Sequence, residues 1–213
     1  YKARKNKRNT INQLKFELNF EHEIFKLCEE IENRTYKPSR EIAFIVNKPV
    51  KREIFAADFR DRVVHHLLFR YISPIIEKYL IYDCYSCRKG KGTSAGIQRA
   101  AKFLRSCSEN YKKDCYVMQM DISGYFMSID RERLFYKVNA MLRIEYQKCA
   151  LSGRAMPFDA GMVDFLLQKT IFRNPVDNCT IKGVRSDWKG LPANKSLFCA
   201  SEGCGLPIGN LTS

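Results

Sequence analysis

The sequence CYVMQMDISGYFMSID, residues 115–130, carries the most structural information in this chain of 213 residues. Its apolar run at residues 116–120 predicts a buried strand that ends at Asp121. A tight turn at Ser123-Gly124 follows, and then two aromatic residues. A carboxylate at the end of a strand, beside a turn that exposes backbone amides, is suited to holding a divalent cation against phosphate. The alternative is that Asp121 only caps the turn.

The net charge is the strongest clue in the composition. The formal net charge is +14 and the pI is ≈ 9.4, which predicts a polyanionic partner because Lys and Arg displace counterions from phosphate backbones. A basic membrane-surface protein is the competing class, but the cations are spread along the chain rather than gathered on one amphipathic helix. No apolar run of about 18 residues is present, so we expect no membrane span. Nucleic acid is therefore the favoured partner.

The nine cysteines do not form a recognisable metal or disulfide pattern. Only Cys84 and Cys87 make a CxxC pair, and Cys199 and Cys204 have the wrong spacing to complete a zinc site. We therefore expect free thiols in a reducing cytoplasm. The first residues lack the apolar stretch of a signal peptide, and the sequence starts without methionine, so we expect an excerpt of a longer protein.

Hydrophobic periodicity and capping residues predict a mainly helical chain with a few short strands. The expected elements are, in order, a basic arm at 2–8 (Lys2, Arg4, Lys5, Lys7 and Arg8), a helix at 12–32, strands at 42–46 and 52–56, a helix capped by Asp58 that ends at about 72 before Pro74, a helix opened by Thr93, the strand before Asp121, a helix capped by Asp130, and a helix at 159–172. Residues 173–204 show weak periodicity, and because unstructured loops of that length are uncommon, we interpret this loop as an insertion or a binding element. The predicted fold class is α+β.

Three further segments have residue types that bind phosphate or shape a binding surface. Residues 48–68 combine a cationic hairpin with an Arg-rich helix, and Arg binds phosphate bidentately. Residues 85–97 place glycines between cations ahead of a helix N-terminus, which permits close approach to phosphate, although they are not a Walker A loop. Residues 203–213 hold a proline between glycines, so this loop is shaped and suited to packing beneath a base pair. The alternatives are a solvated hairpin tip, a linker between helices, and a plain turn before a helix.

The order of these segments resembles that of reverse transcriptases. The first four sequence blocks of that family look like four segments of this chain, in the same order: the basic hairpin with its D-R-V-V helix, YSCRKGKGT, DISGYF and GLPIGNLTS. The likeness covers most of the chain from about residue 42 onward, except the loop before Gly205. Most of the family carry Gln-Gly followed by Ser-Pro in the last block, where this chain has Ile208-Gly209 and then Leu211-Thr212-Ser213. That departure is similar to the enzymes of diversity-generating retroelements, found in bacteria and their phages. Group II intron and retron enzymes are the nearer relatives to exclude.

The resemblance implies a role for each matching residue. Asp121 matches the first catalytic aspartate, and the carbonyl of Ile122 matches a backbone ligand of Mg²⁺. The implied nucleotide-binding residues are Lys48, Lys51, Arg52, Gly124, Tyr125, Phe126, Ile208 and Gly209, and the implied nucleic-acid-binding residues are Arg62, Arg88, Lys89 and Lys91. Phe126 stands where the family has the aromatic that blocks a ribose 2′-hydroxyl. Ile208 removes a polar side chain from the surface beneath the base pair, which implies looser base selection, as in the mutagenic members.

By this resemblance the reaction is RNA-directed DNA synthesis through two-metal phosphoryl transfer, in which paired Mg²⁺ ions activate the primer 3′-oxygen and stabilise the departing pyrophosphate. One carboxylate cannot hold both ions, because Mg²⁺ demands octahedral oxygen ligation. The family supplies the other aspartates from a Tyr-x-Asp-Asp hairpin, a sequence that does not occur in this chain. We therefore expect the complete protein to be a polymerase and this chain alone to be inactive.

The implied architecture is a mostly helical fingers domain with a short hairpin at residues 1–113, followed by the start of a palm sheet at residues 114–213. The loop at 173–204, with the lone Trp188, is a candidate docking or template-contacting element. The implied partners are an RNA template, a DNA primer or RNA–DNA duplex, deoxynucleoside triphosphates and an accessory protein. The implied location is the cytoplasm, for a bacterial or phage-encoded protein.

Two other classes of function stay open at this point. A fingers-like module that grips RNA without chemistry would not need Asp121. A metal-dependent nuclease would combine Asp121 with other acids. The acids available are Asp58, Asp61, Asp83 and Asp130, but none of them has a characteristic spacing.

Overall fold

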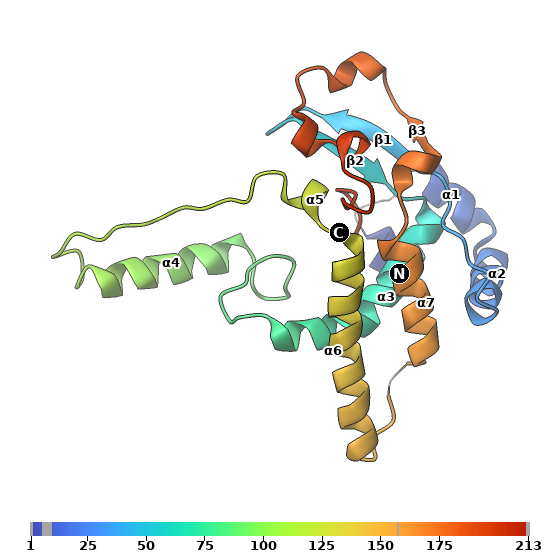
Figure 1. The fold of residues 1–213 in the computed structure, drawn as a ribbon, viewed down its shortest axis with the longest axis horizontal. Coiled ribbons are helices and arrows are strands. Elements are labelled where there is room, and N and C mark those ends of the chain that lie inside the picture. The colour runs from blue at the N-terminus through green and yellow to red at the C-terminus, as the bar shows by residue number, and fades with distance from the viewer. Residues whose placement is uncertain (1, 6–9, 157, 212–213) are drawn as a thin grey trace. The chain divides into compact units, whose positions relative to one another are not determined.

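A computed structural model describes residues 2–5, 10–156 and 158–211. The predicted α+β class is confirmed, because the described residues form seven α-helices and one mixed three-stranded sheet (Figure 1). The α-helices and strands are α1 (Ile11–Leu18), α2 (Phe20–Glu32), β1 (Glu41–Val46), β2 (Arg52–Ala56), α3 (Phe59–Ile76), α4 (Thr93–Cys107), α5 (Tyr125–Ser128), α6 (Arg131–Leu151), α7 (Ala160–Ile171) and β3 (Cys179–Ile181). Lys7 and Arg8 of the basic arm, and Thr212 and Ser213 of the last motif, lie outside the described residues.

The chain divides into two compact units. The first contains the residues up to Ile76 together with those from Ser123 onward, and the second is Glu77–Ile122. The sequence analysis instead predicts a boundary near residue 113, between fingers and palm. That functional division stays a prediction. None of the described helices is both long and apolar enough to cross a membrane.

The main core of the first unit lies where α3, α6 and α7 pack side by side (Figure 1). Its most buried side chains are Val64, Leu68, Leu142, Val163, Leu166 and Leu167. Carboxylate caps begin two of these helices: Asp130, the cap predicted from the sequence, accepts from the backbone amide of Arg133 at 2.9 Å, and Asp159, a cap that was not predicted, accepts from the amide of Met162. Each cap satisfies an amide that has no partner within the helix.

Two helix boundaries differ from the sequence prediction. The expected helix at 12–32 is two helices, because the backbone leaves helical geometry at Asn19 (φ −121°, ψ 38°). Helix α3 continues past Pro74 to Ile76. Proline removes one helical hydrogen bond, and the cost is small this close to the end of the helix.

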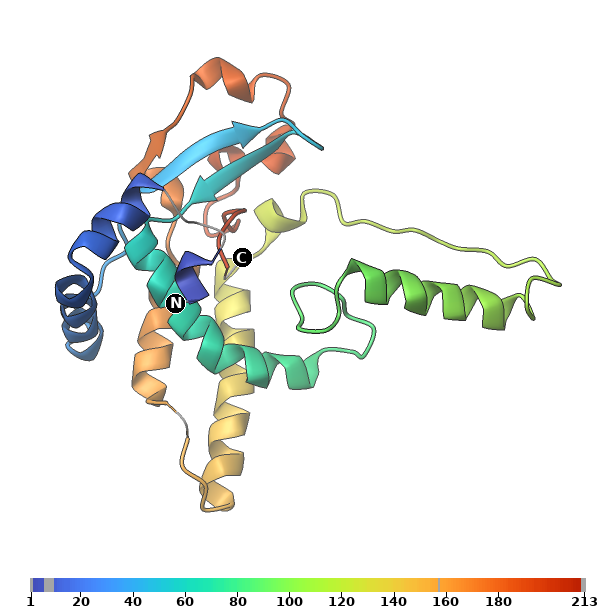
Figure 2. The ribbon, with the colours of Figure 1, turned by 180° about the vertical axis from the view of Figure 1, so that it is seen from behind.

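The cap predicted for α3 is confirmed. The Asp58 carboxylate accepts from the Arg60 amide at 3.0 Å and also from the side chain of Asn12 at 2.9 Å. Phe16 of α1 contacts Phe59, the first residue of α3, with ring centroids 5.2 Å apart. Figure 2 shows α1 beside the start of α3. These contacts hold the N-terminal helix against the start of α3.

The predicted hairpin is confirmed almost to the residue. β1 and β2 pair antiparallel with Ile42 opposite Ala56 and Val46 opposite Arg52. The sheet has a third strand that the sequence did not predict, because β3 lies in the segment read as a loop and pairs parallel to β1 in the order β2-β1-β3. A three-residue strand is too short to show alternation of apolar residues.

The strand predicted at residues 116–120 is wrong for this structure. The segment is irregular and its side chains are exposed, with 92% of the Tyr116 surface and 78% of the Met118 surface accessible. A strand is stabilised by backbone pairing to a neighbour. No described residue pairs with this segment, so apolar composition alone does not create a strand there.

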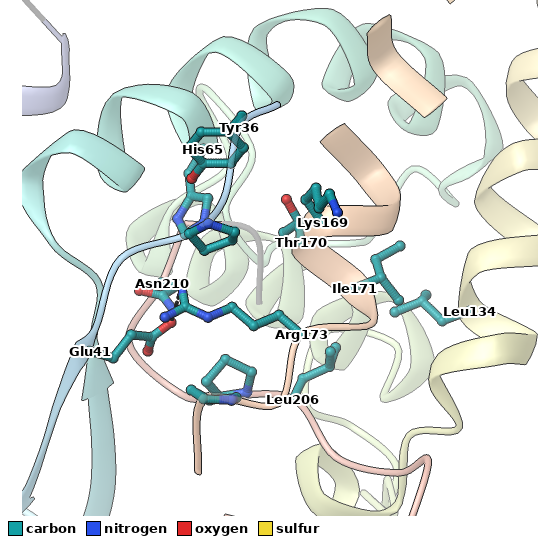
Figure 3. Close-up of a pocket in the computed structure, with 13 residues that line it drawn as sticks. Tyr36, Glu41, His65, Leu134, Lys169, Thr170, Ile171, Arg173, Leu206 and Asn210 are labelled. Atoms are coloured by element: carbon teal, nitrogen blue, oxygen red, sulfur yellow. Dashed lines mark ion pairs between the residues drawn. The ribbon is translucent and has the colours of Figure 1, made fainter. Parts of the chain in front are cut away.

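A buried ionic network ties β1, α3 and the end of α7 together within the first unit. Arg173 lies 3.2 Å from Glu41 (Figure 3) and 3.7 Å from Asp61, and Tyr36 donates to Asp61 at 2.7 Å. Burial raises the pKa of both carboxyl groups, while Arg173 opposes that rise. The network borders a cavity of about 30 Å³, large enough for one water molecule.

His65 gives this region a pH dependence. It lines the same cavity with 7% of its surface exposed, and burial lowers its pKa from 6.5 to about 4, with smaller effects of the Arg173, His66 and Arg62 charges. The folded state therefore binds this proton more weakly than the unfolded chain. The resulting stability is fully present above the unfolded pKa and is lost as the pH falls toward 4, by about 2 kcal/mol between pH 7 and pH 5.

Urea unfolding at pH 7 and pH 5 measures this effect. Between pH 7 and pH 5, we expect the free energy of unfolding of His65→Gln to fall by about 2 kcal/mol less than that of the parent protein. His22→Gln is the matched control, because His22 is exposed on α2. An equal pH dependence in the parent and in His65→Gln would show that the buried histidine is not its source.

Candidate functional site

The β1–β2 hairpin presents cations at its tip. Lys48 and Arg52 are exposed, and their side chains make no hydrogen bond or ion pair among the described residues. Lys51 is partly engaged, because its ammonium donates to the backbone carbonyl of Lys189 at 2.7 Å. Two of the three predicted cations are therefore available to an anionic ligand.

The Ser123-Gly124 turn is held in place by the segment after α7. Gly124 has φ 64°, and a Cβ at this position would lie 2.9 Å from the backbone oxygen of Asn194. The Asn194 side chain donates to the Ser123 hydroxyl at 3.0 Å. Only glycine combines this backbone conformation with so close an approach. The turn then leads directly into α5, whose first residues are Tyr125 and Phe126.

The segment 205–210 lies between α5 and β2 and bonds to both. The amide of Leu206 donates to the Phe126 carbonyl at 2.8 Å, and the amide of Phe55 in β2 donates to the Ile208 carbonyl at 2.9 Å. Phe126 and Ile208 also pack against the same buried cluster, which consists of Ala43, Phe55, Met127 and Leu197. Parts of three predicted motifs, namely residues 123–126, strand β2 of the hairpin and residues 205–210, therefore come together within the first unit.

Gly209 is the tightest point of this arrangement. Its φ is 122°, and a Cβ would lie 2.8 Å from Cγ2 of Ile54 and 3.0 Å from the carbonyl oxygen of Phe55. We expect Gly209→Ala to destabilise the protein by about 2–4 kcal/mol, because backbone strain and overpacking act together.

The matched control is Gly203→Ala. Gly203 also has a positive φ, 73°, but nothing lies within 4 Å of its added Cβ. Both variants place alanine at a positive φ, but only Gly209→Ala adds steric conflict and the larger strain of φ 122°, so denaturant unfolding of the two measures the cost specific to Gly209. Equal losses would show that Gly209 is not packed tightly against β2.

Glu53 is a structural residue that the sequence prediction missed. Its carboxylate, on β2, is 1% exposed and accepts from the Trp188 indole at 2.6 Å, the Ser196 hydroxyl at 2.7 Å and the Leu197 amide at 2.6 Å. The only signal in the sequence was an acid that shares a strand face with Phe55. Through this residue, the segment 173–204 is fastened to the hairpin.

Asp121 and Ile122 are the last two residues of the second unit. The Asp121 carboxylate is exposed and makes no hydrogen bond or ion pair among the described residues. Its oxygen atoms are of the type that Mg²⁺ prefers. The described residues contain no cluster of three or more acidic, His or Cys side chains able to hold a metal ion, so the donors they supply do not by themselves complete a magnesium site.

The predicted nucleic-acid-binding cations mostly hold local structure. In the second unit, Arg88 donates to the Ile81 carbonyl at 3.0 Å, and the Lys91 ammonium lies 3.5 Å from the centre of the Tyr82 ring. In the first unit, Arg62 donates to the carbonyl of Ala3 at 2.7 Å. Of these four residues only Lys89 is exposed with no side-chain partner among the described residues.

The other acids considered as metal ligands have structural partners. Asp58 and Asp130 cap helices, and Asp61 lies in the buried network. Asp83 pairs with Arg99 at 2.9 Å in the second unit, and the hydrogen bond from Arg99 is the main reason that the pKa of Asp83 is lowered. These contacts disfavour a nuclease site built from them.

A scan against protein-family models found no match to the chain, and a search of curated proteins also found none.

Proposed function

We propose that this chain is the nucleotide-binding part of an RNA-directed DNA polymerase of the retroelement type. The observation that supports the proposal is that the SGYF part of the DISGYF motif and strand β2 of the cationic hairpin both contact the LPIGN segment, all within the first unit. These are three of the four motifs on which the resemblance to reverse transcriptases is based. Their contacts are backbone hydrogen bonds as well as side-chain packing, which favours a functional surface over separate surface loops.

The proposal gives each of these residues a task. Arg52 and Lys48 bind the triphosphate, because their charges are exposed and have no partner among the described residues. Phe126 excludes a ribose 2′-hydroxyl and thereby favours deoxynucleotides. Ile208 and Gly209 form an apolar surface beneath the new base pair, and the absence of a polar side chain there allows mismatched bases to be accepted.

Asp121 is the proposed carboxylate ligand for magnesium. It precedes Gly124 by three residues, so chain connectivity alone keeps the two Cα atoms within about 11 Å. When bound, Mg²⁺ would activate the primer 3′-oxygen and stabilise the leaving pyrophosphate. The chain's own contribution is an exposed carboxylate that no described residue neutralises.

The proposed partners follow from the charge. A formal net charge of +14 suits an RNA template paired with a DNA primer, and the proposal includes an accessory protein on the basic surface. The proposed setting is the cytoplasm of a bacterium, with the protein encoded by the bacterium or its phage.

Primer extension by the complete protein that contains this chain tests the proposal. The assay contains a labelled DNA primer on an RNA template, Mg²⁺ and deoxynucleoside triphosphates, and the expected product is a longer primer with frequent misincorporation. Shortened primers would indicate a nuclease. Binding of the primer–template without any change in primer length would indicate a non-catalytic RNA-binding module.

A further inference from the structure

The segment after α7 contains a cavity that none of the proposed polymerase residues line. Its volume is about 230 Å³, and its walls come entirely from residues between Ile181 and Cys199. The apolar and aromatic walls are Ile181, Trp188, Leu191 and Phe198, and Arg185, Ser196 and Cys199 complete the lining. Pockets for drug-sized ligands span about 300–1,000 Å³, so this cavity suits a single flat ring system.

Its aromatic wall is fixed in orientation. The Trp188 indole donates to the buried carboxylate of Glu53 at 2.6 Å, and its ring meets Phe198 edge-to-face, with centroids 6.0 Å apart and planes at 82°. Phe198 in turn packs against Phe55 of β2, with centroids 5.6 Å apart. A side chain held on two sides loses little conformational freedom when a ligand stacks against it.

The surroundings of the cavity are cationic. Arg185 lines the cavity, is exposed, and makes no ion pair or side-chain hydrogen bond among the described residues. Lys182 and Lys189, three and four residues away from Arg185 in sequence, are also exposed. The nearest acid in sequence, Asp187, is engaged locally because its carboxylate accepts from the Val184 amide at 3.0 Å. An aromatic wall beside unpaired cations matches the combination that binds an unpaired base and its phosphate.

We infer that this cavity binds one unpaired base of a single-stranded nucleic acid, with the base against Trp188 and the adjoining phosphate against Arg185. The inference rests on the nucleic-acid partner in the proposed function and does not require DNA synthesis. Stacking against an aromatic face is tolerant of sequence, because every base has such a face. The site therefore holds a strand without selecting its sequence.

Intrinsic fluorescence tests the inference directly, because Trp188 is the only tryptophan in the 213-residue chain. The probe is a short single-stranded RNA, and the matched probe is an abasic oligonucleotide of the same length and charge. We expect the RNA to quench the fluorescence in a saturable way and the abasic strand to bind without quenching. Equal quenching by both strands would overturn the inference, because only backbone charge would then be sensed.

A second test uses a variant in which the cavity is smaller. Cys199 is exposed at its edge and takes no part in the Glu53 hydrogen bonds, so Cys199→Leu reduces the space without changing charge. We expect RNA affinity to fall about tenfold, equivalent to ~1.4 kcal/mol, which is within the range for stacking of one base. Affinity for the abasic strand stays unchanged. Cys28→Leu, at an exposed position on α2, is the matched control.

Different results would reject the polymerase function and the base-binding cavity. Loss of quenching in Cys199→Leu together with no primer extension by the complete protein would retain the base site and reject the polymerase. Primer extension with RNA affinity unchanged in Cys199→Leu would retain the polymerase and reject the base site. Quenching of Trp188 fluorescence by an aromatic-rich peptide but not by RNA would also reject the base site. That result would assign the cavity to a protein partner.

Discussion

Replacing Asp121 with asparagine is expected to reduce primer extension by the complete protein about a thousandfold or more. The magnitude follows from the several kilocalories per mole that a correctly held metal ion contributes to phosphoryl transfer. The affinity for primer–template is expected to change little, because the contacts with the phosphate backbone come from the cations. Single-turnover extension with saturating nucleic acid measures the chemical step apart from binding.

The position of Asp121 makes this experiment easy to interpret. Its carboxylate is exposed and has no partner among the described residues, so asparagine breaks no contact that stabilises the fold. Asp114→Asn is the matched control, because Asp114 is also exposed, lacks a partner among the described residues and lies on the same irregular segment. We expect this control to retain full extension.

An extension rate within about threefold of that of the parent protein would contradict the role given to Asp121, because loss of a metal ligand changes rates by far more than that. A non-catalytic RNA-binding module predicts that outcome. If both variants lost activity equally, the effect would come from the net charge of the segment rather than from a single carboxylate.

Local signals in the sequence predicted the hairpin and most helix starts correctly. The caps Asp58, Asp130 and Asp159 are short-range features, because each carboxylate accepts from an amide within about one turn of helix. Helix α4 begins at the predicted Thr93 without a side-chain cap. The hairpin also follows from local alternation and a short connection. Such features depend little on the rest of the chain, so a single sequence reveals them.

Long-range pairing could not be predicted in the same way. The residues 116–120 have the composition of a strand, yet no described residue pairs with them. β3 has only three residues, yet it joins β1 because the segment around it is fastened elsewhere. The DISGYF motif predicted the Ser123-Gly124 turn, but not that Asn194 packs against it.

Replacing Glu53 is expected to have the largest effect on stability. Its two carboxylate oxygens accept from three donors, and a carboxamide can accept through only one of its terminal atoms. In Glu53→Gln, either the Leu197 amide or the donors from Trp188 and Ser196 therefore face an NH₂ group. One buried donor left unsatisfied costs about 1–3 kcal/mol, and the other two hydrogen bonds each lose about 1 kcal/mol when the acceptor is no longer charged, so we expect a loss of about 3–5 kcal/mol in the free energy of unfolding.

The same substitution connects stability with the candidate site. The segment 173–204 is held to β2 through Glu53, and it carries both Asn194, beneath the Gly124 turn, and Trp188, in the wall of the cavity. We expect the segment 173–204 to detach from β2 in Glu53→Gln before the rest of the protein unfolds. The fluorescence emission of Trp188 then shifts to longer wavelength at denaturant concentrations where circular dichroism shows that the helices remain folded. Glu29→Gln, at an exposed position on α2, is the matched control and is expected to change stability by less than about 0.5 kcal/mol. If the Trp188 emission shift and the loss of helicity occurred at the same denaturant concentration in Glu53→Gln, the segment would unfold only together with the rest of the first unit. Glu53 would then stabilise the whole unit rather than one wall of the site.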